Sequence, residues 1–416
     1  MKNNIHIIEE NESNVRYYCR RFAKEFAKAK MSKMFTADGA EYIDFFSGAG
    51  TLNYGHNNEY IVNKIIEYLK NDGIIHALDM YTSAKIDFIH KFQNKILIPR
   101  QYDYKMMFCG PSGTNANEAA LKIVRKYTGR KNVIAFMGAF HGMTLGSIAL
   151  TSSSFARRGA GVQLDNTIFI PYYGADIDSL KYLEMILEDD HSGIEKPAAI
   201  FLETVQGEGG VNVADYKWIA ELYDICKKNQ ILLVCDEVQT GCGRVGTFFS
   251  FEKAGIQPDI VTLSKSISGC GLPMSLLLLK PEIDCLDAGE HNGTFRGNQL
   301  AFVGASAAID YVIENDVWKK VLNNERYIKA YLEQEILSID SKIQCRGRGM
   351  IWGIDFGGFE EKTCNEISKK CFENGVIIET SGRRGSVLKI LPPLVINREE
   401  LTAGLNVIKK TIEDSL

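Results

Sequence analysis

The most regular pattern along the chain is a series of short apolar runs, rich in β-branched residues, that alternate with segments of helical periodicity. The runs are Val133–Met137, Thr167–Ile170, Ala198–Leu202, Ile231–Cys235, Asp259–Leu263 and Met274–Leu279. Their hydrophobicity is continuous rather than alternating, which is typical of strands that are covered on both faces. The pattern therefore predicts an α/β fold with a large, mostly parallel sheet between helices.

The pattern changes after residue 315, where a long amphipathic helix is predicted. The elements expected there are helices at Val317–Leu337, at Glu361–Asn374 and from Arg398, and strands at Gly349–Phe356, Val376–Glu379 and Val387–Leu391. Residues 1–57, with a helix expected at Asn14–Ala29 and a hairpin at Met34–Phe46, are too few to bury a core alone. We therefore expect a large domain at 58–315 and a smaller α+β domain at 316–416, with residues 1–57 packed on the smaller one.

Charge, cysteine usage and hydropathy exclude several classes of protein. The 416 residues include 48 Lys and Arg and 52 Asp and Glu, so no excess of positive charge is available to bind nucleic acid. The 10 cysteines form no Cys-x-x-Cys pair, which favours reduced thiols and a cytoplasmic location. The first 30 residues lack the apolar core of a signal peptide, and no apolar run reaches the roughly 18 residues of a membrane span. We expect neither secretion nor a membrane partner.

Two reactive side chains follow predicted strands. Asp236 comes directly after the run that ends at Cys235, and Lys265 comes two residues after Leu263, the end of another run. Each alone has a simpler interpretation, because Asp often caps a turn and Lys is usually a solvated surface charge. Together they match the requirement of pyridoxal phosphate chemistry, in which an amine condenses with an aldehyde and a carboxylate keeps the pyridine nitrogen protonated.

A helix is predicted to begin at Ser112, Gly113 and Thr114. Free backbone N–H groups at such a helix start can hold a phosphate. A hydroxyl before a helix is also the ordinary N-cap, so this motif alone leaves both interpretations open.

Aromatic and acidic residues follow two further runs. Phe140 and His141 could stack on a planar cofactor, or could be a core residue and a satisfied loop residue. Glu203 and Glu208 place two carboxylates after Leu202. Because no His cluster stands at ligand spacing, we expect no metal site.

Taken in chain order, these motifs together with His291–Asn298 resemble the class III pyridoxal-phosphate aminotransferases of fold type I. The 29-residue step from Asp236 to Lys265, through Gly241–Arg244, is similar to the signature of that family. The resemblance spans nearly the whole chain and implies a seven-stranded, mostly parallel sheet in the large domain.

The resemblance implies roles around the cofactor ring. Lys265 would condense with the aldehyde of pyridoxal 5'-phosphate, Asp236 would pair with the pyridine nitrogen, and Gln239 would contact the phenolic oxygen. Phe140 would stack on one face of the ring and Val238 would pack on the other.

The remaining roles concern the phosphate and the partner subunit. Ser112–Thr114 would hold the phosphate, and His141 and Glu203 would be further cofactor contacts. Thr294 would reach the phosphate of the cofactor in a neighbouring subunit. This last role implies a homodimer with shared active sites, and further assembly of dimers stays open.

Within the family, Asp44–Asn58, Asp79–Lys85, Gly110–Ala116 and Ala139–Gly146 resemble the diaminobutyrate–2-oxoglutarate transaminases. This resemblance implies exchange of the terminal amino group between L-2,4-diaminobutyrate and 2-oxoglutarate, in an ectoine, siderophore or diaminopropane pathway. Two alternatives stay open: another ω-amine donor such as ornithine, 4-aminobutyrate or a diamine, and a cofactor-binding sensor without turnover.

Substrate contacts are the least defined part of the resemblance. Lys389 precedes a Pro-Pro-Leu motif where relatives such as ornithine aminotransferase have Arg, and Lys lacks the bidentate fork of Arg. We expect Glu208 and Lys389 to form a gate, with Tyr54 as a further substrate contact. Arg157 or Arg158 would bind the distal carboxylate, unless both belong to a solvated basic loop.

Overall fold

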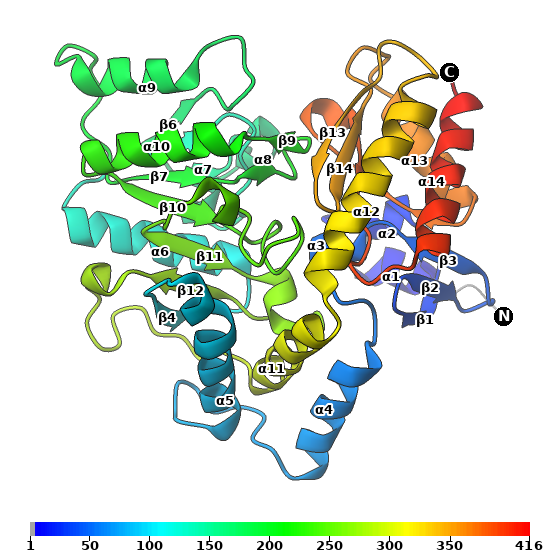
Figure 1. The fold of residues 1–416 in the computed structure, drawn as a ribbon, viewed down its shortest axis with the longest axis horizontal. Coiled ribbons are helices and arrows are strands. Elements are labelled where there is room, and N and C mark those ends of the chain that lie inside the picture. The colour runs from blue at the N-terminus through cyan, green and yellow to red at the C-terminus, as the bar shows by residue number, and fades with distance from the viewer. Residues whose placement is uncertain (1–4) are drawn as a thin grey trace.

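The computed structural model describes residues 5–416, and its largest feature is a seven-stranded sheet (Figure 1). The strand order is β4-β12-β11-β10-β7-β5-β6. The strands are β4 (Lys105–Phe108), β5 (Val133–Phe136), β6 (Thr167–Ile170), β7 (Ala199–Leu202), β10 (Leu232–Asp236), β11 (Ile260–Leu263) and β12 (Leu276–Leu279). All pairings are parallel except those of β12, which runs antiparallel to both β11 and β4. The predicted α/β fold with a mostly parallel sheet is confirmed.

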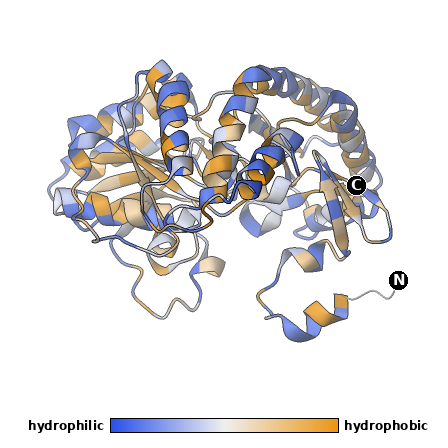
Figure 2. Cartoon of the chain, turned by 90° about the horizontal axis from the view of Figure 1, so that it is seen from below, coloured by the Kyte–Doolittle hydropathy of each residue, from blue (hydrophilic) through white to orange (hydrophobic). Residues whose placement is uncertain are grey.

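Alternate residues of the central strands enter different hydrophobic clusters. Val234 and Ile260 belong to the cluster that includes α6 (Gly113–Thr128), whereas Leu233 and Val261 belong to the cluster that includes α10 (Tyr216–Lys228). Both faces of the sheet are therefore buried, which explains the continuous apolar runs. Figure 2 shows these strands in the hydrophobic colours between helices of mixed character.

Helices cover this sheet and connect it to the rest of the chain. The other helices are α1 (Ile5–Asn11), α2 (Tyr18–Arg21), α3 (Ser47–Gly50), α4 (Glu59–Lys70), α5 (Ser83–Phe92), α7 (Leu145–Leu150), α8 (Ser154–Arg157), α9 (Ser179–Glu188), α11 (Gln299–Glu314), α12 (Val317–Tyr331), α13 (Thr363–Glu373) and α14 (Arg398–Glu413). Within residues 5–416, none of them combines the length and apolar composition that crossing a membrane requires.

The C-terminal part contains an antiparallel four-stranded sheet in the order β13-β14-β17-β16. These strands are β13 (Gln344–Arg348), β14 (Ile351–Asp355), β16 (Glu379–Ser381) and β17 (Val387–Ile390). The predicted helices are confirmed as α12, α13 and α14. The hydrophobic pattern did not indicate β13, because this edge strand has a polar sequence and no fully buried side chain.

The N-terminal part joins the C-terminal part through a second sheet, β1-β2-β3-β15. The hairpin expected near residue 40 is present as β2 (Lys33–Thr36) and β3 (Glu41–Asp44), and β3 pairs in parallel with β15 (Val376–Ile377). The helix expected at Asn14–Ala29 is wrong: only α2 is helical there, and β1 (Phe26–Lys30) pairs with β2.

The reason for this error lies in tertiary contacts. The Phe26 ring packs on Tyr42 and Phe372, at centroid distances of 5.4 Å and 6.4 Å, which favours a strand over the helix propensity of the Ala and Lys residues that follow. The domain boundaries at residues 57 and 315 stay predictions, and residues 1–4 of the first part lie outside the described residues.

Candidate active site

Asp236 and Lys265 meet at one edge of the large sheet. Asp236 is the last residue of β10, and Lys265 begins a 3-10 turn (Lys265–Ser268) directly after β11 and Ser264. Because β10 and β11 are neighbouring parallel strands, both side chains reach the same cavity, of about 170 Å³. A larger groove of about 580 Å³ beside Tyr172 and Arg346 includes neither residue.

The cavity contains most of the predicted site. It is lined by Gly113, Thr114, Asn117, Phe140, His141, Gly142, Glu203, Val205, Glu208, Asp236, Val238, Gln239, Thr240 and Lys265.

Hydrogen bonds keep the Asp236 carboxylate ionised. Asp236 Oδ2 accepts from Asn117 Nδ2 at 2.8 Å and lies 2.7 Å from His141 Nδ1, while Oδ1 accepts from the Val238 N–H at 3.0 Å. Burial raises the pKa of Asp236, but the hydrogen bond and charge of His141 outweigh it, so the pKa lies below its ordinary value. Burial lowers the pKa of His141, but Asp236 outweighs it and the pKa is raised. Both pKa shifts favour the ionised forms of the pair, a carboxylate beside an imidazolium.

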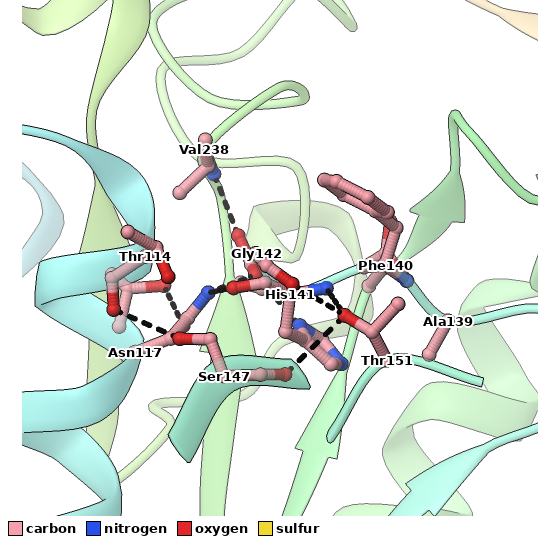
Figure 3. Close-up of polar contacts among 12 residues, drawn as sticks. Thr114, Asn117, Ala139, Phe140, His141, Gly142, Ser147, Thr151 and Val238 are labelled. Carbon is pink, nitrogen blue, oxygen red and sulfur yellow. Dashed lines mark hydrogen bonds and ion pairs between the residues drawn. The ribbon is translucent and has the colours of Figure 1, made fainter. Parts of the chain in front are cut away.

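The loop around His141 is fixed by several short polar contacts (Figure 3). The His141 N–H donates to Thr151 Oγ1 at 3.0 Å, Thr151 Oγ1 donates to the Gly142 carbonyl at 3.0 Å, and Asn117 Nδ2 donates to the His141 carbonyl at 2.8 Å. Thr262 Oγ1 in turn donates to Asn117 Oδ1. Sequence reasoning missed Asn117, although a polar residue on the buried face of an amphipathic helix was an available signal.

Glu203 supports the aromatic side of the cavity. Its Oε1 accepts from the Phe140 N–H at 3.0 Å, and its backbone carbonyl accepts from the Tyr172 hydroxyl at 2.7 Å. Burial raises the pKa of Glu203 to about 8, against the opposing charge of His141. Glu203 therefore holds the backbone of Phe140, whose ring lines the cavity.

The Lys265 amine is held by a backbone carbonyl. Lys265 Nζ donates to the Ala49 carbonyl at 2.9 Å, and Gln239 Nε2 donates to the same oxygen at 3.1 Å. Ala49 lies in a turn with φ of 58°, a left-handed conformation that L residues seldom adopt. Burial and Lys389 lower the pKa of Lys265 and outweigh Glu208, which raises it. A lowered pKa favours the neutral, nucleophilic amine.

The start of α6 forms one wall of the cavity. Ser112 caps the helix in a reciprocal arrangement with Asn115, so the ordinary N-cap interpretation holds for this side chain. A Cβ atom on Gly113 would lie 2.9 Å from the methyl groups of Val238, so glycine is required by this close approach. Thr114 Oγ1 lies 2.7 Å from Thr144 Oγ1. Gly113 and Thr114 line the cavity at the positive end of a 16-residue helix.

The expected contact between Glu208 and Lys389 is present, with a second carboxylate beside it. Lys389 Nζ lies 2.6 Å from Glu208 Oε1 and 2.8 Å from Glu379 Oε1. Burial raises the pKa of Glu208, but Lys389 and Lys265 outweigh it and lower the pKa to about 2. Burial and Glu208 raise the pKa of Glu379 despite Lys389, and the two carboxylates raise the pKa of Lys389 against its burial. Sequence reasoning missed Glu379.

Four predicted residues do not line the cavity: Ser112, Lys389, Tyr54 and Thr294. The Tyr54 side chain is buried and its hydroxyl donates to the Cys242 carbonyl at 3.0 Å, so this geometry gives no support to a substrate contact. Thr294 is exposed on a loop, and its carbonyl lies 2.9 Å from His76 Nε2. Thr294 is therefore directed toward a surface and not toward the cavity of its own chain.

The two candidate arginines also have other partners. Arg157 Nη1 donates to the carbonyls of Ile148, Ala149 and Thr151 at the end of α7. The Arg158 guanidinium lies over the Phe155 ring, 5.6 Å from its centroid. The Arg157 guanidinium is thus already bound to backbone carbonyls. Arg158 is exposed, as expected for a residue of a solvated basic loop.

The fold and the site agree with the comparison of this sequence with protein families. Residues 20–412 match the family model described as Aminotransferase class-III. The chain belongs to the class III aminotransferases, and it is an aminotransferase.

More specific similarities come from curated relatives. The chain is 51% identical over 416 residues to the diaminobutyrate–2-oxoglutarate transaminase of Sporosarcina pasteurii, covering 99% of this chain and 98% of that one. It is 49% identical to the transaminase of the same name from Bordetella parapertussis, covering 99% and 95%. The corresponding values for the one from Streptomyces coelicolor are 46% identity, with 98% of each chain covered.

Solved structures show the same fold at lower identity. The ornithine aminotransferase of Toxoplasma gondii, which has partial occupancy of PLP at its active site, is similar with a TM-score of 0.87 and 24% identity, covering 99% of this chain and 93% of that one. The acetylornithine aminotransferase of Elizabethkingia anophelis has a TM-score of 0.83 and 26% identity, with both chains fully covered.

Proposed function

We propose that the protein exchanges the terminal amino group between L-2,4-diaminobutyrate and 2-oxoglutarate, with aspartate 4-semialdehyde and glutamate as the products. The observation that carries this proposal is the single cavity that joins Lys265 to the ionised Asp236, in a chain about half identical to transaminases of that name. We further propose that this exchange serves an ectoine- or siderophore-type pathway.

The residues of the cavity fit pyridoxal phosphate. Lys265 offers an amine of lowered pKa, Asp236 a buried carboxylate, and the start of α6 a set of N–H donors. Phe140 and Val238 supply flat and apolar surfaces for the two faces of a ring. When bound, this cofactor supplies an aldehyde that takes up the amino group and a ring that withdraws electrons from the reacting carbon.

The side chains of this protein position the groups and move the protons. Asp236, whose Oδ2 lies 2.7 Å from His141 Nδ1, would keep the proton on the ring nitrogen. Lys265 Nζ would take the proton from the reacting carbon of the amino donor and pass it to the cofactor in the first half, and would move a proton in the opposite direction in the second half. Gln239 would contact the phenolic oxygen, and Gly113 and Thr114, which line the same cavity, would hold the phosphate.

A switch is needed because glutamate reacts at its α-carbon and diaminobutyrate at its terminal amine. In our proposal, Glu208 pairs with Lys389 when diaminobutyrate is bound, and moves away so that Lys389 binds the α-carboxylate of glutamate. The 2.6 Å ion pair supports the paired state, and the 31% exposure of the Glu208 side chain supports the movement away from it.

We also propose a homodimer in which Thr294 serves the cofactor of the partner subunit. The segment 74–81 exposes a row of apolar side chains, among them Tyr81, which is 95% exposed. This segment touches the Thr294 loop through His76, so a partner subunit would cover both.

A cytoplasmic location is supported by the 10 free cysteines, six of which are buried.

The experiment that tests the proposed function is a donor panel. The purified protein, saturated with cofactor and 2-oxoglutarate, is given diaminobutyrate, ornithine, 4-aminobutyrate or a diamine, and glutamate formation is measured. We expect the highest kcat/KM for diaminobutyrate. A higher value for another donor would assign the chain to that donor, and cofactor binding without glutamate formation would indicate a sensor.

A further inference from the structure

Two carboxylates share one buried ammonium group behind Glu208, which lines the cavity, whereas Lys389 and Glu379 do not. Lys389 on β17 is 0% exposed and contacts both Glu208 and Glu379, at 2.6 Å and 2.8 Å. We call these three residues the Lys389 cluster. The cluster carries one positive and two negative formal charges, so the two carboxylates share a single ammonium group.

The two carboxylates differ in how firmly they are held. Glu379 lies on β16 directly opposite Lys389 in the antiparallel ladder, and its side chain is only 3% exposed. Glu208 follows β8 (Val205–Gln206) in a segment with glycines on both sides, and its side chain is 31% exposed. Burial and its place in the ladder fix Glu379 beside Lys389. Glu208 accepts hydrogen bonds from Lys389 Nζ and Gln239 Nε2, but its exposure gives it room to move away.

Departure of Glu208 would be strongly unfavourable if it were the sole counter-ion. Removing one partner of a buried ion pair leaves an uncompensated charge in a poorly solvated site. With Glu379 in place, the ammonium keeps one carboxylate when Glu208 moves. An incoming carboxylate then restores the original charge count, because it replaces Glu208 one for one.

We infer that Glu379 is a positioning residue that holds Lys389 as a paired ammonium while Glu208 moves away and a substrate carboxylate takes its place. The inference rests on the proposed function, because it assumes that a carboxylate enters at Lys389. A lysine suits this arrangement because its ammonium group has three N–H donors that can be directed to separate partners.

The inference predicts that Glu379 affects the rates at which a carboxylate binds to and leaves Lys389 more than it affects the binding equilibrium. Glu208 and the incoming carboxylate compete for the same ammonium and both experience the charge of Glu379, so its effect on their exchange largely cancels. The intermediate in which neither is bound depends on Glu379 alone. Loss of Glu379 should therefore slow both entry and exit of a carboxylate at Lys389.

The test uses glutarate, a dicarboxylate without an amino group, and the holoenzyme. Its binding is followed by stopped-flow absorbance of the bound cofactor in wild type, Glu379→Gln and the control Glu360→Gln, which removes the same charge from an exposed residue. We expect association and dissociation rate constants to fall together by about tenfold in Glu379→Gln, with little change in Kd and no change in the control.

The same substitution is also made in the Glu208→Gln variant, and this comparison separates the proposed effect from a folding defect. In Glu208→Gln the leaving carboxylate is gone, so adding Glu379→Gln should produce no further slowing of glutarate binding. Unchanged rates in Glu379→Gln, a change in Kd alone, or the same slowing in both backgrounds would overturn the inference. Because glutarate is not a donor, these rates can be read even if the donor panel rejects diaminobutyrate, so the two failures are distinguishable.

Discussion

His141 determines the protonation state of Asp236, and replacing it should move the pH profile of the enzyme. His141→Phe removes the partner 2.7 Å from Asp236 Oδ2 and keeps a ring of similar size. The carboxylate remains buried, with Asn117 and the Val238 N–H as its hydrogen-bond donors. Burial, which raises the pKa of Asp236, is then less opposed.

The magnitude follows from the lost contact. A hydrogen bond between charged groups contributes about 1.5–3 kcal/mol, and 1.36 kcal/mol corresponds to one pKa unit, so the pKa of Asp236 should rise by about one to two units. In wild type the pKa is depressed, so the ionised form is lost only at low pH. In the variant, protonation begins at higher pH, and the acidic limb of activity moves upward by the same amount.

The assay is the single-turnover rate with each donor between about pH 4 and 9, with His191→Phe as the control. His191 is exposed and pairs with Asp190, away from the cavity. The acidic limb should shift in His141→Phe alone, together with weaker cofactor retention. An unshifted limb in His141→Phe, or an equal shift in the control, would refute the role of His141.

Three further predictions concern other parts of the site. Gly113→Ala should lower cofactor retention and destabilise the fold by about 1–3 kcal/mol, because the new methyl group would lie 2.9 Å from the Val238 methyl groups. Dialysis measures the retention and thermal unfolding measures the stability, and unchanged values would contradict the close approach. Thr294→Ala mixed with Lys265→Ala should regain partial activity in hybrid dimers, since one site then has both residues intact; failure of hybrids to regain activity would argue against a shared site. Glu208→Gln should raise the single-turnover rate with glutamate relative to that with diaminobutyrate, and equal changes for both donors would make the Glu208–Lys389 contact purely structural.

Burial on both faces is the reason that much of the fold could be predicted from the sequence. Six of the seven strands in the large sheet, including the edge strand β6, are continuous apolar runs. The other edge strand, β4, was not predicted, because its four residues begin with an exposed Lys105 and only the last is fully buried. The N-terminal strand β1 was expected to be helical, since its sequence Phe-Ala-Lys-Ala-Lys suits a helix locally and only Tyr42 and Phe372 decide otherwise.

In the site too, residues marked by their place in the sequence could be predicted, whereas residues placed by tertiary contacts could not. Asp236 and Lys265 could be located because both follow strands in the sequence. Glu379 could not, because its position opposite Lys389 depends on the register of β16 and β17. Ala49 acts through its backbone carbonyl, which carries no side-chain signal.

The central claim is that Lys265 is the residue that carries the cofactor. The most direct measurement is borohydride reduction of the holoenzyme followed by peptide mass mapping, in wild type and in Lys265→Ala. The account predicts a single modified peptide containing Lys265 in wild type, and no modified peptide in the variant. A modification retained in Lys265→Ala, or found at another lysine in wild type, would contradict it.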